Sequence, residues 1–217
     1  MKIKACIFDL DGVVVDTARY HYIAWKKIAK DLGFSFSQQE NERLKGVSRM
    51  DSLDILLQLG NITMDDAKKE DLAAIKNNLY VSYILQMTPD EILPGVIAFL
   101  DELRANGILI ALGSASKNAK FILDRINLAD KFDAVIDGNR VSKAKPDPEV
   151  FLKGAAELRI EPQNCVVFED AQAGIDAARN AGMNIIGIGQ PDNLKQADYV
   201  IPGFEKMNIN HLRSWYL

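Results

Sequence analysis

The chain has 217 residues, 48% of them apolar, which suits one packed core with a smaller additional unit rather than several full domains. Its 26 basic and 30 acidic residues are mixed along the sequence and give a net charge of −4. Because no basic stripe is available for a polyanionic backbone, we expect no nucleic-acid partner. A small phosphorylated ligand stays possible, since it needs only a few local cations.

The sequence also bears on cellular location. Its apolar runs are all well short of the roughly 20 residues of a membrane span, and no segment resembles a cleavable secretory signal. Cys6 and Cys165 each lie in a short apolar run, which favours two reduced core thiols over a disulfide or a metal pair. We predict a cytoplasmic protein with no membrane partner and, because no spare apolar surface segment is evident, a monomer.

Short β-rich apolar runs alternate with segments of helical periodicity along most of the chain. The runs end near Leu10, Gly113, Ile136, Phe168, Gly187 and Ile201. This alternation predicts an α/β fold with a Rossmann-like parallel-sheet core covered by helices on both faces. The first run is apolar almost without interruption up to Asp9, as expected of a central strand, so a ligand is expected at its carboxyl end.

The segment between the first two runs is far longer than one crossover helix requires. It has helical signals throughout: we expect helices over Thr17 to Leu32, from Ser48 to Leu59, and from Thr63 to about Met87. We therefore predict an α/β catalytic core formed by residues 1–15 and 88–217, and an inserted helical cap formed by residues 16–87. Two linkers on one side of the core would act as a hinge, and a hinged cap can exclude water.

The later helices have equally clear start and stop signals. They are expected from Pro94 to Gly107, from Ser116 through Lys117 to Leu128, from Asp147-Pro148 through Glu149 to Leu158, and from Ala173 to Gly182. The helices of the core are therefore clearly marked in the sequence.

Two strand ends carry pairs of carboxylates. Asp9 and Asp11 follow the first run, with Gly12 allowing a sharp turn, and Glu169 and Asp170 close a later run. Asp9 and Asp11 alone would suit a simple turn cap. Because the exits of parallel strands open on the same edge of a sheet, four carboxylates would meet there, and such crowding favours a divalent cation such as Mg²⁺.

Two further features suit a phosphoryl group. Ser114 and Ser116 end another run and precede a helix, where free backbone N–H groups attract anions, although serine there is often only a cap. Lys145 is held in a proline-rich turn, although a single lysine there usually faces solvent. Carboxylates for a metal, a hydroxyl and a lysine are together the parts that phosphoryl transfer requires.

The ordered segments Asp9-Leu-Asp11-Gly-Val-Val-Val-Asp-Thr17, Ser114, Lys145-Pro and Glu169-Asp170 resemble the motifs of the haloacid dehalogenase superfamily, over essentially the whole chain. The resemblance implies that Asp9 is the nucleophile that becomes an aspartyl phosphate and that Asp11 is the general acid/base. It also implies one Mg²⁺ per chain, held by Asp9, the backbone carbonyl of Asp11, Asp170 and Glu169.

The predicted cap contains a stretch that could hold a second phosphate. Lys45, Gly46, Val47, Ser48 and Arg49 combine a turn, a helix N-terminus and two cations, although an ordinary loop with exposed charges would have the same composition. With His21 to Trp25, Lys76-Asn77 and Ser114 to Asn118, this stretch is similar to the sugar-phosphate mutases of the superfamily.

That similarity implies interconversion of β-D-glucose 1-phosphate and glucose 6-phosphate, with glucose 1,6-bisphosphate as intermediate and primer. Asp9, Ser114, Lys145 and Mg²⁺ are expected to serve phosphoryl transfer. The remaining substrate contacts are expected from Trp25, Lys45, Gly46, Val47, Arg49, Lys76, Ala115, Ser116, Lys117 and Asn118, of which Arg49 and residues 116–118 would hold the distal phosphate.

Thr17 and His21 complete the expected catalytic set. His21 lies just past Thr17 and could bond to the Asp11 region when the cap is closed, or be a partly buried surface histidine. Trp25 shares its helix face and could contact the sugar or simply pack in the core. Two other functions stay open: a sugar-phosphate phosphatase with the same nucleophile, and a non-catalytic sugar-phosphate sensor, which the intact catalytic set disfavours.

Overall fold

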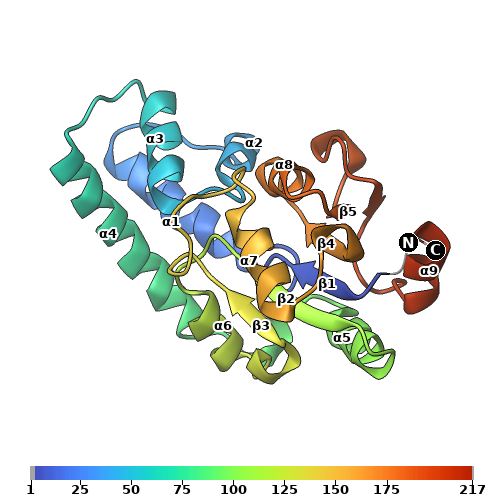
Figure 1. Cartoon of the computed structure of the whole chain (residues 1–217). Helices are drawn as coiled ribbons and strands as arrows, with labels where there is room; N and C mark the ends of the chain where they lie inside the picture. The colour runs from blue at the N-terminus through green and yellow to red at the C-terminus, as the bar shows by residue number, and fades with distance from the viewer. Residues whose placement is uncertain (1–2, 217) are drawn as a thin grey trace.

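The computed structural model describes residues 3–216 and contains a single parallel sheet (Figure 1). Its strand order is β3-β2-β1-β4-β5-β6. The strands are β1 (Ala5–Phe8), β2 (Leu109–Gly113), β3 (Ala134–Ile136), β4 (Cys165–Glu169), β5 (Asn184–Ile188) and β6 (Tyr199–Ile201). All six runs identified in the sequence are strands, and the α/β prediction is confirmed. The strand order reverses between β1 and β4, which is where open α/β sheets bind their ligands.

Both faces of the sheet are covered by helices. Helices α5 (Val96–Ala105), α6 (Ala119–Arg125) and α9 (Ile209–Tyr216) pack on one face, and α7 (Glu149–Leu158) and α8 (Gln172–Asn180) pack on the other. Within β1, Cys6 and Phe8 pack with α5, α6 and α9, whereas Ala5 and Ile7 pack with α7 and α8. Successive side chains of a strand point to opposite faces of the sheet, so this alternation is expected. Helix α6 begins two residues later than predicted, because the Ser116 hydroxyl accepts a bond from the Asn118 N–H in a turn ahead of the helix.

Between β1 and α5 the chain forms four further α-helices, which lie together on one side of the sheet (Figure 1). They are α1 (Ala18–Asp31), α2 (Gln38–Asn41), α3 (Arg49–Leu59) and α4 (Asp66–Ile84), and α1, α3 and α4 share an apolar cluster around Trp25. The predicted N-cap residue of α4, Thr63, is wrong: the N-cap is Asp65, whose side chain accepts a hydrogen bond from the Lys68 N–H at 2.9 Å. Among residues 3–216, no helix is both long enough and apolar enough to cross a membrane.

The two segments that join this insertion to the sheet run side by side. Val15 pairs with Ile92 in an antiparallel bridge, and the Leu93 N–H donates to the Val14 carbonyl at 3.0 Å. The Asp16 N–H donates to the Glu91 carbonyl at 3.2 Å. The entrance and exit of the insertion are therefore bonded to each other next to the end of β1.

Candidate active site

Three carboxylates converge where β1 and β4 end. Phe8 of β1 is opposite Phe168 of β4, so Asp9 and Glu169 leave neighbouring strands at the same level. One oxygen each from Asp9, Glu169 and Asp170 lies within 4.8 Å of the other two. Asp9 and Glu169 are buried, and Asp170 is nearly so. Of the four carboxylates expected to meet at this sheet edge, these three do so, whereas Asp11 is not part of the cluster.

Two glycines make room for this cluster. Gly12 has a φ of +83°, and a Cβ there would lie 2.3 Å from Asp170 Oδ2. A Cβ on Gly174, in α8, would lie 2.0 Å from Glu169 Cδ. Any larger residue at either position would push a carboxylate out of place, so the two glycines define the shape of the acidic site.

Lys145 is the cation of this cluster. Its Nζ donates to Asp9 Oδ1 at 2.6 Å and to Glu169 Oε2 at 2.8 Å, and its side chain is fully buried. Burial alone would favour the neutral amine, but the two carboxylates outweigh it and raise the pKa of Lys145. The side chain is thus a fixed ammonium beside Asp9 and is shielded from solvent, unlike an ordinary turn lysine.

The donor set fits a hard divalent cation. Burial raises the pKa of Asp170 to about 7. The nearby charge of Lys45 opposes this shift, and the negative charges of Asp9 and Asp11 add to it. Three carboxylates with a single buried ammonium leave excess negative charge that is costly to bury unless a proton or cation compensates it. Mg²⁺ prefers such oxygen ligands, bound at about 2.1 Å in octahedral geometry. We conclude that the cluster is suited to a divalent metal.

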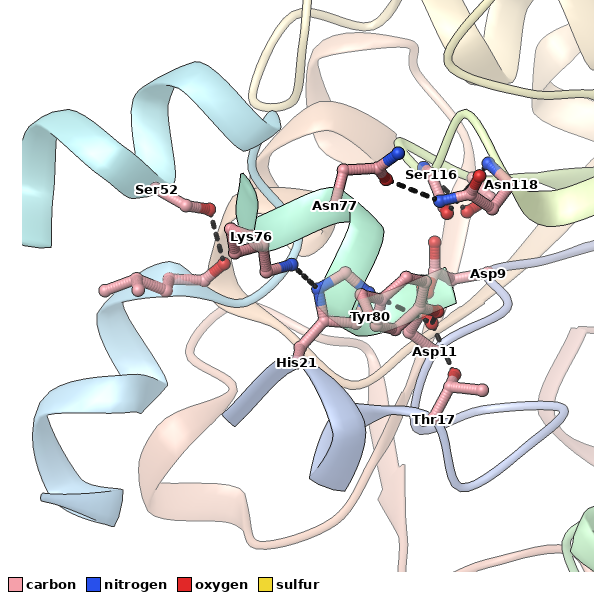
Figure 2. A network of polar contacts seen from close by, with 12 residues as sticks. Asp9, Asp11, Thr17, His21, Ser52, Lys76, Asn77, Tyr80, Ser116 and Asn118 are labelled. Atoms are coloured by element: carbon pink, nitrogen blue, oxygen red, sulfur yellow. Dashed lines mark hydrogen bonds and ion pairs between the residues drawn. The ribbon is translucent and has the colours of Figure 1, made fainter. Parts of the chain in front are cut away.

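Asp11 has different partners, although it lies two residues from Asp9. Its Oδ1 accepts a hydrogen bond from the Thr17 hydroxyl, and the Tyr80 hydroxyl lies 3.5 Å away (Figure 2). Burial, followed by the negative charge of Asp9, raises the pKa of Asp11 to about 6. A carboxyl group with such a pKa can give up and regain a proton near neutral pH, which is what an acid/base residue needs.

His21 reaches toward Asp11 but bonds to another side chain. Its Nε2 is 3.7 Å from Asp11 Oδ1, too far for a hydrogen bond, whereas its Nδ1 is 2.9 Å from Lys76 Nζ (Figure 2). Burial, and then the charge of Lys76, lower the pKa of His21 well below its usual value. In this structure His21 thus lies beside Asp11 without a hydrogen bond to it, and its other ring nitrogen contacts Lys76.

Lys76 is itself almost fully buried, at 2% exposure. Its Nζ lies 4.7 Å from the Trp25 ring centre and 4.9 Å from that of Tyr80. Burial and the nearby charge of Arg49 lower the pKa of Lys76 to about 7. The aromatic faces partly stabilise the ammonium, but an anion in front of it would stabilise it further.

A cavity of about 590 Å³ separates the insertion from the sheet. This volume is in the range that holds small ligands. The cavity is bordered by Asp9, Asp11 and Lys145 at the sheet edge and by Arg49 and Lys117 elsewhere. The other predicted residues on its wall are His21, Trp25, Lys45, Gly46, Val47, Lys76, Ala115, Ser116, Asn118 and Asp170. Arg49 and Lys117 have no ion-pair partner among residues 3–216, so both cations are available to a ligand.

Several contacts cross from the insertion to the core. Lys45 Nζ is 3.6 Å from Asp170 Oδ2, and a Cβ on Gly46 would come within 2.9 Å of the Ala171 Cβ. Farther along the cavity, Asn118 Nδ2 donates to Asn77 Oδ1 at 3.1 Å (Figure 2). The insertion therefore touches the core both beside the acidic cluster and beside residues 116–118.

Some predicted residues lie behind the cavity wall. Ser114 is fully buried at the end of β2, where its Oγ accepts the Ser116 N–H at 3.1 Å. Trp25 is 1% exposed and packs in the insertion core, as one of its two alternatives states, and it also borders the cavity. Sequence reasoning missed Tyr80, which lies one helical turn after Lys76 on α4 and could have been found from that spacing.

The parallel sheet, the acidic cluster and the buried lysine define a phosphoryl-transfer site at a strand exit. The family model of the haloacid dehalogenase-like hydrolases matches residues 3–182, and the chain belongs to this family.

The chain is also similar in sequence and structure to individual proteins. The chain is 44% identical over 200 residues to the β-phosphoglucomutase of Bacillus subtilis, covering 91% of this chain and 88% of that protein. The crystal structure of β-phosphoglucomutase from Clostridium difficile matches with a TM-score of 0.94 and 44% identity, over 99% of this chain and 97% of that one. A phosphorylated carbohydrates phosphatase of Thermotoga maritima is 30% identical over 187 residues, 84% of this chain and 83% of that protein.

Proposed function

We propose that the chain is a phosphomutase that interconverts β-D-glucose 1-phosphate and glucose 6-phosphate. The observation that carries the proposal is one cavity with cations at two places: Lys145 beside Asp9, and elsewhere on the wall Arg49 and Lys117, which have no ion-pair partner among residues 3–216. A sugar with phosphates on carbons 1 and 6 needs two such places. The 44% identity to β-phosphoglucomutases along nearly the whole chain supports the same reaction.

In the transfer step, a carboxylate oxygen of Asp9 attacks the phosphorus of β-glucose 1,6-bisphosphate. The phosphorus–oxygen bond to the sugar breaks as the bond to Asp9 forms, and the departing sugar oxygen takes a proton. Lys145 and the Ser114 hydroxyl are assigned to the phosphoryl oxygens, whose charge they would stabilise. An acyl phosphate is reactive enough to return its phosphoryl group to another sugar hydroxyl.

We assign one Mg²⁺ per chain to Asp9, the backbone carbonyl of Asp11, Asp170 and Glu169, where it would supply positive charge for the transferring phosphoryl group. Glu169 holds Lys145 at 2.8 Å in addition. The excess negative charge of the cluster supports this assignment.

Asp11 is assigned to the proton transfer. It would give its proton to the sugar oxygen that leaves the phosphorus and accept one from the sugar hydroxyl that attacks phospho-Asp9. Thr17, as a donor to Asp11 Oδ1, would hold the carboxyl group in place. His21, 3.7 Å from the same oxygen, would add a second donor after a small movement.

The distal phosphate is assigned to Arg49, Ser116, Lys117 and Asn118, with Lys76 behind them. The remaining substrate contacts, to the sugar and its first phosphate, are assigned to Trp25, Lys45, Gly46, Val47 and Ala115. The bisphosphate must turn around between the two transfers. At each step one of its phosphates lies at Asp9 for transfer while the distal residues bind the other. This requirement explains why a mutase needs cations away from Asp9, whereas a simple phosphatase does not.

We further propose that residues 16–87 form a cap domain on a core of residues 1–15 and 88–217. The bonded linkers at Val15 and Ile92 would serve as its hinge, and its closure would exclude water from phospho-Asp9. Without that exclusion, hydrolysis would compete with return of the phosphoryl group to the sugar.

The rival function is a sugar-phosphate phosphatase with the same nucleophile, as the 30% identical Thermotoga maritima protein is named. The deciding experiment supplies β- and α-glucose 1-phosphate with a trace of glucose 1,6-bisphosphate and Mg²⁺. It measures glucose 6-phosphate by coupled reduction of a nicotinamide cofactor and inorganic phosphate in parallel samples. We expect glucose 6-phosphate from the β-anomer to exceed phosphate release; faster phosphate release would sink the mutase proposal.

A further inference from the structure

The segment that delivers Lys145 to Asp9 has no regular secondary structure. Residues 137–148 connect β3 to α7, and none of them belongs to a helix or a strand. Residues 141–145 all border the cavity, and this run ends at Lys145. The buried ammonium of Lys145 must be held between two carboxylates, yet the segment that carries it lacks the regular hydrogen bonds of a helix or strand. Other hydrogen bonds must therefore fix the shape of that segment.

Glu149, the first residue of α7, makes the contacts that do this. Its Oε2 accepts three bonds from the segment: from the Ser142 N–H at 2.8 Å, the Ser142 hydroxyl at 2.9 Å and the Lys143 N–H at 2.8 Å. Its Oε1 is 2.6 Å from Lys153 Nζ, one turn further along α7. Lys153 Nζ also donates to the Arg140 carbonyl at 2.6 Å. Both carboxylate oxygens are thus engaged, and the segment is bonded to the helix at Arg140, Ser142 and Lys143.

An ordinary helix-capping role does not account for this pattern. Acidic residues in a first turn usually accept bonds from N–H groups of that same turn. The donors to Glu149 instead lie six and seven residues before it, on the cavity wall. The Glu149 N–H is itself satisfied by Asp147 Oδ1 at 3.0 Å, so Asp147 does the capping. The Lys153 bond, followed by the backbone and hydroxyl donors, lowers the pKa of Glu149 to about 2, which keeps it a carboxylate at neutral pH.

We propose that Glu149 is a positioning residue for phosphoryl transfer: it holds Ser142 and Lys143 so that Lys145 Nζ lies between Asp9 and Glu169. This inference deepens the proposed function, because it rests on Lys145 stabilising the transferring phosphoryl group. A misplacement of about 1 Å in such a group can cost on the order of 100-fold in rate.

The main test is Glu149→Gln, which keeps the size of the side chain. Its amide group must point its NH₂ either at the donors of Ser142 and Lys143 or at Lys153 Nζ, so donor faces donor in both orientations. The matched control is Glu157→Gln on the same helix, which removes the ion pair to Arg140 at 2.5 Å but no contact with residues 141–145. Lys153→Met is a milder second variant: it removes the contact with Glu149 Oε1 and the bond to the Arg140 carbonyl, but leaves the three bonds that Glu149 Oε2 accepts.

The readout is the single-turnover rate of Asp9 phosphorylation by glucose 1,6-bisphosphate, measured by rapid quench and mass spectrometry. We expect Glu149→Gln to slow this step by about 10- to 100-fold, Lys153→Met to slow it less, and Glu157→Gln to stay within about twofold of wild type. Lys145→Ala and the double variant with Glu149→Gln complete a cycle. Because Glu149 acts through Lys145, adding Glu149→Gln to Lys145→Ala should cause no further loss.

Two results would overturn the inference. One is an equal loss from Glu149→Gln with and without Lys145, which would indicate a general structural role. The other is a crystal structure of Glu149→Gln in which Lys145 Nζ keeps both its contacts. The second readout needs no activity, so it also decides the matter if the wild-type protein takes no phosphate from the bisphosphate, a result that would refute the proposed function instead.

Discussion

Replacement of Arg49 by alanine should separate the mutase reaction from simple hydrolysis. Arg49 is the first residue of α3, is partly buried and borders the cavity without an ion-pair partner among the described residues. Burial lowers its pKa, and its charge also lowers the pKa of Lys76. A bound phosphate would offset both the cost of burying the Arg49 charge and the repulsion between Arg49 and Lys76.

The size of the effect follows from the lost contact. Hydrogen bonds to charged groups contribute about 1.5–3 kcal/mol each, which corresponds to about a 10- to 150-fold fall in kcat/KM for glucose 6-phosphate formation. A small phosphoester with one phosphate has nothing to place beside Arg49. Its slow hydrolysis should therefore change by less than about threefold, since its transition state loses no interaction.

The assay measures both reactions on the same preparations, with Arg43→Ala as the control. Arg43 lies in the same part of the insertion but is exposed and does not border the cavity. We expect Arg43→Ala to match wild type in both assays. If Arg49→Ala reduced the two reactions by the same factor, Arg49 would not hold a distal phosphate, and the two-subsite reasoning would be refuted.

Three further predictions concern the buried charges. Because its lowered pKa makes Lys76 bind fewer protons in the ligand-free folded chain than in the unfolded one, Lys76 should add about 2 kcal/mol to the unfolding free energy between pH 7 and 9. Urea titrations should show this difference between wild type and Lys76→Met, and an identical pH dependence of the two proteins would contradict it. Mg²⁺ at about 100 times its Kd should add about 2.7 kcal/mol to wild-type stability and little to Asp170→Asn; equal gains would argue against a metal role for Asp170. Gly174→Ala should displace Glu169 and weaken Mg²⁺ binding in calorimetry by about tenfold or more. The helical control Gly154→Ala, whose Cβ meets no atom closer than 3.5 Å, should bind normally, and equal affinities in both variants would show that Glu169 tolerates the crowding.

The fold was largely predictable because its signals are local. The six apolar runs are short and bounded by turn residues, and all but the half-buried β6 are largely buried. Glu149 follows the Asp147-Pro148 signal at the start of α7. Where the prediction failed, two neighbouring residues offered the same signal. Thr63 and Asp65 can both cap a helix, and in the structure Asp65 caps α4.

The site was predictable to the extent that sheet geometry dictates it. Strand exits bring Asp9, Glu169 and Asp170 together, and their positions in the chain were enough to foresee this. The contact between His21 and Lys76 could not be foreseen, because it depends on how α1 packs on α4. The periodicity of a sequence indicates which face of each helix is apolar, but it does not specify how two helices are rotated relative to each other when they pack.

The bridge between Val15 and Ile92 has a consequence for how such a molecule folds and diversifies. Ala5 pairs with Leu109 across the whole insertion, so the centre of the sheet depends on distant parts of the chain, whereas α1 to α4 can collapse on neighbours. Since the ends of the insertion meet at one point, the helices between them can be lengthened, shortened or exchanged while the strand order stays the same. Natural variation of this kind would change one wall of the cavity and leave the carboxylates at the ends of β1 and β4 untouched.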